Sequence, residues 1–203
     1  AMVASLRRVA HCGRMAPMPV LSLTEDDLRA RTSLKWRRYP ADVLPLWVAE
    51  MDVAVHPAVL DAVGAALAAG DTGYPVGSEY EDAFAAVAAA RWGWEFDPRA
   101  QAVRVGDVMN AILAILEATT EPGDSVVINP PVYPPFRQVV EGYRRRLVEV
   151  HLTASGRLDL DGLAEAFAAE RPAAYLLCSP HNPTGTVNTR EEVAAVATLC
   201  ATY

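Results

Sequence analysis

The chain has 203 residues with 25 acidic and 18 basic side chains, a formal net charge of −7, and a hydrophobic content of 52%. This apolar content is enough for a packed core and excludes disorder as the main state. The negative balance argues against a dedicated nucleic-acid or anionic-membrane binder, which normally carries a basic face. The basic residues are almost all arginine, and Lys35 is the only lysine.

The three cysteines, Cys12, Cys178 and Cys200, are odd in number and widely spaced. Neither a disulfide framework nor a zinc site with the four histidines is expected, so we predict a reducing compartment, the cytoplasm. No uncharged apolar run approaches the roughly 18 residues that span a bilayer. Residues 1–30 lack the serine richness of a transit peptide and are expected to form a disordered tail.

From residue 44 onward, helix-like and strand-like segments alternate. Alanine-rich or periodic stretches predict helices over 56–69, 79–91, 108–119, 134–142, 160–169 and 191–203. Short apolar runs predict strands over 102–105, 125–128, 147–152 and 174–178. Apolar strands separated by helices are typical of βαβ units, so we expect an α/β fold with a mainly parallel sheet.

Ligands of parallel sheets bind beyond the carboxyl ends of the strands. After the first predicted strand, residues 105–110 read V-G-D-V-M-N and open a helix, where free N–H groups and the helix dipole suit a phosphate. An ordinary turn in which Asp107 is the N-cap explains the same residues. This motif alone favours the ordinary turn.

Two further loops follow predicted strands. Residues 129–136 read N-P-P-V-Y-P-P-F, and the prolines stiffen the backbone around Tyr133, whose ring can stack on a planar ligand or cap the core. Residues 179–185 read S-P-H-N-P-T-G. Asn182 precedes a proline, so it is held extended, and its amide can donate to an oxyanion at the sheet edge. N-P-T-G is by itself a common turn, but its place after an apolar strand makes it more specific.

These motifs resemble a known family. Residues 179–185 match the S-P-x-N-P-T-G signature of class I/II aminotransferases, which are fold-type I enzymes dependent on pyridoxal 5'-phosphate (PLP). Residues 35–52, K-W…Y-P…L-P-L-W-V-A-E-M-D, resemble the corresponding run of the cystathionine β-lyase-like branch, and residues 72–74 lie where that branch has a G-Y pair. The resemblance covers residues from about Arg31 onward, and the chain resembles only the N-terminal portion of such an enzyme.

The resemblance implies a cofactor role for each loop. The backbone N–H groups of Val108 and Met109 would hold the phosphate of PLP. Tyr133 would stack on the pyridine ring, and Asn182 would donate a hydrogen bond to the phenolic oxygen of that ring. No metal is implied.

Two implied roles fall outside these loops. The backbone around Ala49 would approach the carboxylate of a small amino-acid substrate. Tyr74 would reach the phosphate bound by a neighbouring subunit, since the active sites of the family lie at a dimer interface. We therefore expect a homodimer, with no nucleic-acid or membrane partner.

The resemblance also divides the chain. Residues 1–30 would be the tail, 31–60 an N-terminal arm and small-domain segment, and 61–203 the first part of the PLP-binding large domain. The last predicted helix should lead into another strand, because right-handed crossovers return the chain to the sheet. We therefore expect a sheet that is incomplete at the C-terminus, in the front part of a longer protein.

Several residues depart from the pattern of the family. Asp107 stands where many relatives have a small residue, and a carboxylate beside a phosphate is unfavourable unless it turns away. Glu50 replaces the usual aspartate of the branch, and His181 occupies a variable position. Asp52 is expected to be a structural turn residue. The basic run 144–146 is expected to be a solvated face.

Chemistry with PLP requires a lysine that forms a Schiff base and moves the proton at the substrate α-carbon. In the family that lysine lies well downstream of N-P-T-G, and Lys35 matches a different position. No catalytic residue is therefore assigned within this chain, and whether the chain alone is an enzyme is left open.

For the parent protein, the resemblance implies a carbon–sulfur β-lyase that cleaves cystathionine or cysteine S-conjugates to a thiol, pyruvate and ammonia. A PLP-dependent aminotransferase is the alternative, because both reactions share a carbanion. A truncated, non-catalytic fragment or a dimerising or regulatory module is the alternative from another class.

We predict that the 203-residue chain alone binds PLP with a dissociation constant of millimolar or weaker. A phosphate at a helix start contributes up to about 2 kcal/mol, ring stacking about 0.5–1.5 kcal/mol and one hydrogen bond about 0.5–1.5 kcal/mol. A 1 mM constant already needs about 4 kcal/mol. Equilibrium dialysis measures the constant, and a yellow preparation that borohydride reduction labels on Lys35 would contradict the prediction.

Overall fold

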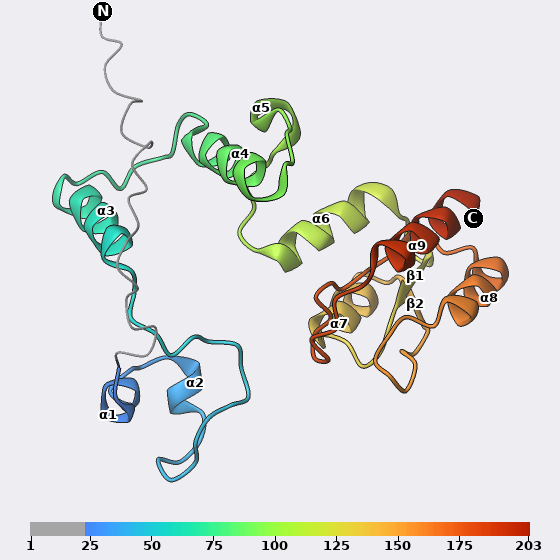
Figure 1. Ribbon diagram of the computed structural model, residues 1–203, viewed down its shortest axis with the longest axis horizontal. Coiled ribbons are helices and arrows are strands. Elements are labelled where there is room, and N and C mark those ends of the chain that lie inside the picture. The colour runs from blue at the N-terminus through green and yellow to red at the C-terminus, as the bar shows by residue number, and fades with distance from the viewer. Residues whose placement is uncertain (1–22) are drawn as a thin grey trace, which may run out of the picture. The chain divides into compact units, whose positions relative to one another are not determined.

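A computed structural model describes residues 23–203 (Figure 1). Residues 1–22 of the expected disordered tail therefore lie outside the described residues. The chain divides into two compact units with a boundary between Gly77 and Ser78, and each unit is described by itself.

The first unit contains three helices in its described part: α1 (Glu25–Arg29), α2 (Leu34–Arg37) and α3 (Pro57–Ala68). The predicted helix at 56–69 is α3, and it begins at a proline. Residues 25–29 fall in the stretch expected as tail, yet they form α1 because a capping box starts it: Thr24 Oγ1 accepts from Asp27 N, and Asp27 Oδ2 accepts from Thr24 N.

The second unit begins with α4 (Glu79–Trp92), as predicted, and the short α5 (Pro98–Gln101). The strand expected at 102–105 is wrong, because these residues form no strand and Val103 is 87% exposed. A strand exists only through hydrogen bonds to a neighbouring strand. An apolar run therefore does not form one unless such a neighbour is present.

The remaining predicted strands form one parallel sheet: β1 (Ser125–Ile128), β2 (Arg146–Glu149) and β3 (Ala174–Tyr175). The order is β2-β1-β3, and Val127 of the central strand pairs with Val148 and Tyr175. The expected α/β class with parallel strands is confirmed, although β2 and β3 are shorter than predicted.

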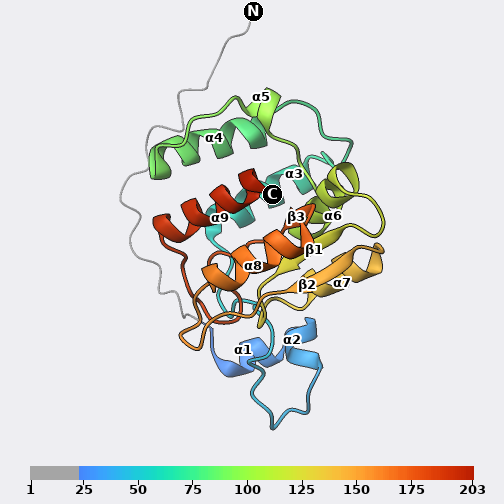
Figure 2. The same ribbon diagram turned by 90° about the vertical axis from the view of Figure 1, so that its right-hand side faces the viewer.

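Helices cover both faces of the sheet (Figures 1 and 2). On one face, Val126 packs in a cluster with side chains of α6 (Val108–Thr119) and α7 (Pro135–Gly142). On the other face, Val127 packs with side chains of α8 (Leu160–Glu170) and α9 (Arg190–Thr202). Successive residues of a strand point to opposite faces, so the apolar β1 supplies both cores.

The basic run 144–146 is not simply a solvated face. Arg145 is 9% exposed, and its guanidinium donates to the carbonyls of Thr120 and Tyr143 at 2.8 and 2.7 Å and to Thr120 Oγ1 at 2.9 Å. These acceptors lie past the end of α6 and before β2. Arg145 thus satisfies carbonyls at a helix end, a role that the charge pattern did not indicate.

The connections define where a ligand fits. The chain leaves β1 for α7 on one face, and it leaves β3 for α9 on the other face. Because β1 and β3 are neighbours, the carboxyl ends of these two strands form a topological switch point, which is where open α/β sheets bind ligands. The loops of Tyr133 and Asn182 both begin there.

Candidate functional site

Asn129 joins the carboxyl ends of all three strands. It follows β1 directly and is 1% exposed, and its Nδ2 donates to the carbonyl of Val150, just after β2, at 2.9 Å. Its Oδ1 accepts from the hydroxyl of Tyr175 in β3. The sequence reading missed both residues, although a polar residue immediately after a buried strand was a usable signal.

Tyr175 is the donor in this contact because the amide oxygen of Asn129 can only accept a hydrogen bond. Burial also raises the pKa of the Tyr175 hydroxyl above its ordinary value. Its ring packs edge to face on Phe167 of α8, with 5.9 Å between ring centroids. The end of β3 is thus fixed both by a hydrogen bond and by aromatic packing.

Tyr133 lies in the loop between β1 and α7. It is 39% exposed, and its ring packs edge to face on Phe136 of α7, with 6.1 Å between centroids and 82° between planes. A hollow of about 340 Å³ lies beside it, but the lining includes Glu149 and Gln138, on the β2 and α7 side. The loop of Asn182 follows β3, which lies on the other side of β1 from β2.

The loop of Asn182 is a closed turn. His181 N donates to the carbonyl of Thr186 at 2.7 Å, and Gly185 N donates to the carbonyl of His181 at 2.6 Å. Gly185 has φ +73°, a left-handed conformation that favours glycine. Asn182 is exposed, and its backbone N donates to Cys178 Sγ at 3.4 Å, which leaves the side-chain amide at the surface of the turn.

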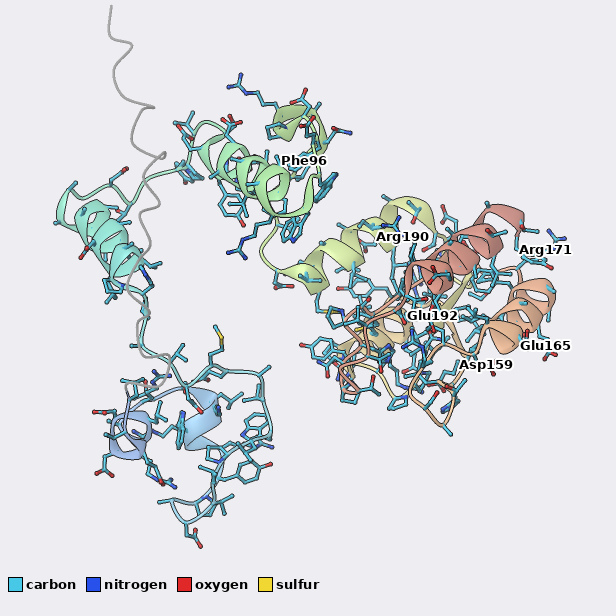
Figure 3. The ribbon with its side chains drawn as sticks, viewed as in Figure 1. Phe96, Asp159, Glu165, Arg171, Arg190 and Glu192 are labelled. Carbon is cyan, nitrogen blue, oxygen red and sulfur yellow. The ribbon has the colours of Figure 1, made fainter. Side chains whose placement is uncertain are left out.

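A second turn supports this loop from behind. A Cβ on Gly156 would lie 3.4 Å from Thr186 Oγ1, so the turn at 153–157 packs closely on the loop of Asn182. Arg157 in that turn pairs with Glu192, which also caps the start of α9 through Thr189 N. Figure 3 labels Glu192 on α9 together with Asp159, the N-cap of α8. The hydrogen-bonded ion pair with Arg157 holds the pKa of the Glu192 carboxyl below its usual value.

His181 brings the two loops together. Its side chain is buried, and Nε2 lies 2.9 Å from the carbonyl oxygen of Pro131, two residues before Tyr133. The loops of Tyr133 and Asn182 are therefore in contact at the switch point. The sequence assigned no role to His181.

Asp107 is the N-cap of α6, as one reading of its motif predicted. Its two carboxylate oxygens accept from Asn110 N and Asn110 Nδ2, both at 2.8 Å. The carboxylate is thus engaged by its own helix. Val108 and Met109 are the first two residues of α6, so their N–H groups have no acceptor in a preceding helical turn.

In the first unit, buried Lys35 holds the segment that contains Ala49. Its Nζ donates to the carbonyl of Glu50 at 2.8 Å and pairs with Asp52 Oδ2 at 2.6 Å, and Trp36 Nε1 donates to Asp52 Oδ1 at 3.0 Å. The hydrogen bond from Lys35 holds the pKa of Asp52 below its usual value. The expected structural role of Asp52 agrees with these contacts.

Ala49 and Tyr74 both lie on loops of this unit. Ala49 is exposed in the segment that Lys35 holds, and Tyr74 is fully exposed in the loop between α3 and α4. Their roles toward a substrate and a neighbouring subunit stay predictions, as do the cofactor contacts of the second unit.

Residues 41–203 match the family model of aminotransferase class I and II. This match covers most of the chain, and the chain belongs to that family.

Two relatives illustrate its range. The chain is 48% identical over 191 residues to the "Putative cystathionine beta-lyase" of Mycobacterium tuberculosis, covering 90% of this chain and 47% of the relative. It is 34% identical over 149 residues to the "Probable N-succinyldiaminopimelate aminotransferase DapC" of the same species, covering 70% of this chain and 37% of the relative. The chain therefore spans about half the length, or less, of these curated relatives.

A solved structure shares the fold. A "putative plp-dependent beta-cystathionase" of Corynebacterium diphtheriae superposes with a TM-score of 0.81 at 34% identity, covering 89% of this chain and 47% of that one. The α/β arrangement described above is thus shared with the matching part of that protein.

Residues 23–203 contain neither a candidate membrane span nor a candidate metal cluster. No described helix combines the length and apolarity needed to cross a bilayer. No three or more histidine, cysteine or acidic side chains in this part of the chain gather where they could hold a metal ion.

Replacing Tyr175 by phenylalanine should lower the free energy of unfolding by about 1–3 kcal/mol, because Asn129 Oδ1 stays buried without its donor. Urea denaturation of the 203-residue chain followed by circular dichroism measures the change. Tyr143→Phe, at a 40% exposed tyrosine, is the matched control and should change stability by less than about 0.5 kcal/mol. Equal losses in both variants would contradict the prediction.

Acid should weaken the first unit through Asp52. Because the folded-state pKa lies below the ordinary 3.8, the contribution of this carboxylate is complete above pH 3.8 and is lost as the pH falls through the lower, folded-state value. Carbon-detected NMR titration of Asp52 follows this directly. Lys35→Met should move the pKa of Asp52 up, toward 3.8, and an unmoved titration would show that Lys35 is not the cause.

Proposed function

We propose that this chain is the N-terminal portion of a PLP-dependent carbon–sulfur β-lyase that cleaves cystathionine or cysteine S-conjugates to a thiol, pyruvate and ammonia. The observation that carries the proposal is the 48% identity, over 90% of this chain, to a relative named for cystathionine β-lyase activity. The shared fold with a β-cystathionase supports it.

The residues of the second unit fit PLP. Helix α6 begins with two N–H groups directed away from the helix, and the carboxylate of Asp107 is held by Asn110. A phosphate at Val108 and Met109 would therefore meet donors and the positive end of the helix dipole. When bound, PLP supplies an electron sink for the carbanion that forms at the substrate α-carbon.

The two loops at the switch point would orient the ring. The ring of Tyr133 packs edge to face on Phe136, so the orientation of the Tyr133 ring is fixed before a planar ligand stacks on it. The amide of Asn182 lies at the surface of a closed turn, where it can donate to the phenolic oxygen. Preset donors and faces lower the entropy lost on binding.

Lys35 does not take the covalent role in this proposal. Its Nζ is buried and donates to one carbonyl and one carboxylate, so the amine is not free to attack a carbonyl carbon. It acts instead on the segment of Ala49, whose backbone would receive the substrate carboxylate.

We further place the enzyme in the cytoplasm as a homodimer. The two described cysteines, Cys178 and Cys200, are free, which suits a reducing compartment. Tyr74 is fully exposed on a loop, so it is available to a second subunit.

The full-length protein tests this function. Incubation with cystathionine should release homocysteine, pyruvate and ammonia in equal amounts, measured by a thiol reagent and a coupled pyruvate assay. Exchange between an amino donor and a 2-oxoacid without thiol release would favour the aminotransferase alternative, which the 34% identical relative supports. No turnover in either assay would favour a non-catalytic module.

A further inference from the structure

We propose that His181 is a positioning residue: its neutral imidazole, protonated on Nε2, holds the loop of Tyr133 against the loop of Asn182 and so sets the spacing of the two ring contacts. The inference rests on the proposed function, because the spacing matters only if both residues contact one planar cofactor.

The contacts of the imidazole define its tautomer. His181 is 2% exposed, and Nε2 lies 2.9 Å from the carbonyl oxygen of Pro131, which can only accept a hydrogen bond. Nδ1 is also buried and has no hydrogen-bond partner among the described residues. A proton on Nδ1 would leave a buried N–H without an acceptor, so the proton belongs on Nε2.

The loop of Tyr133 needs a donor from outside. Residues 129–135 contain four prolines, which have no N–H, so this segment has few donors with which to fix its own conformation. The Pro131 carbonyl therefore relies on a donor from another part of the chain. His181 comes from 50 residues away along the sequence and supplies it.

The imidazole is itself well anchored. The backbone N of His181 donates to the carbonyl of Thr186, and the carbonyl of His181 accepts from the backbone N of Gly185. Both groups are therefore part of the closed turn. Since Asn182 is the next residue, and Tyr133 lies two residues after Pro131, one hydrogen bond connects the two proposed ring contacts across the switch point. Its loss would leave each loop in place but free to move relative to the other.

The tautomer is tested on the 203-residue chain by nitrogen-15 NMR of the imidazole. We expect a protonated Nε2 and an unprotonated Nδ1 for His181 as a single tautomer. A protonated Nδ1, or a mixture of the two neutral tautomers, would overturn the proposal.

Three variants separate positioning from general stability. His181→Phe fills the same space without a donor, and His181→Gln keeps an N–H near the place of Nε2. His151→Phe, at an exposed histidine, is the matched control. Backbone order parameters of Val132 and Tyr133 should fall from the rigid value of about 0.85 toward about 0.6 in His181→Phe alone.

Recovery of these order parameters in His181→Gln would support the donor role, and rigid loops in His181→Phe would overturn it. In the full-length protein, His181→Phe should weaken PLP binding about two- to tenfold, the loss expected for one hydrogen bond. A full-length protein that binds no PLP would contradict the proposed function, whereas the tautomer and the order parameters test the role of His181 on their own.

Discussion

The carboxyl end of the sheet depends on one buried amide. Three parallel strands end side by side, and each leaves backbone carbonyls that must find donors away from water. Asn129 meets this need at the centre, by donating to Val150 and accepting from Tyr175. Because the loop of Tyr133 begins at this residue, the direction in which the chain leaves β1 is set by a contact that spans β2, β1 and β3.

Both units use the same physical device. In each, a buried polar side chain hydrogen-bonds to a backbone carbonyl near an exposed candidate residue: Lys35 to Glu50 beside Ala49, and His181 to Pro131 in the loop of Tyr133. Loops have few apolar contacts of their own, so a hydrogen bond protected from water is an effective way to hold one conformation. Rigidity at the candidate site is therefore local and polar, whereas rigidity of the fold comes from the apolar faces of β1.

Local signals in the sequence were sufficient for most elements. Helix α6 was predicted at its observed ends because its N-cap and apolar periodicity are both local, and the parallel sheet followed from apolar runs between helices. The strand at 102–105 failed because pairing is not local. The hydrogen bond between Tyr175 and Asn129 spans 46 positions of the sequence, and the contact between His181 and Pro131 spans 50. No spacing rule in a single sequence indicates such pairs.

The contacts of the single lysine show its role in the first unit. An ammonium has three N–H donors, and Lys35 directs two of them to the Glu50 carbonyl and the Asp52 carboxylate inside the first unit. Removing Lys35 would leave the Glu50 carbonyl without this donor and the Asp52 carboxylate with Trp36 Nε1 as its remaining described side-chain donor, which would loosen the segment of Ala49. The described contacts of Lys35 are therefore structural, because they hold the segment of Ala49 in place.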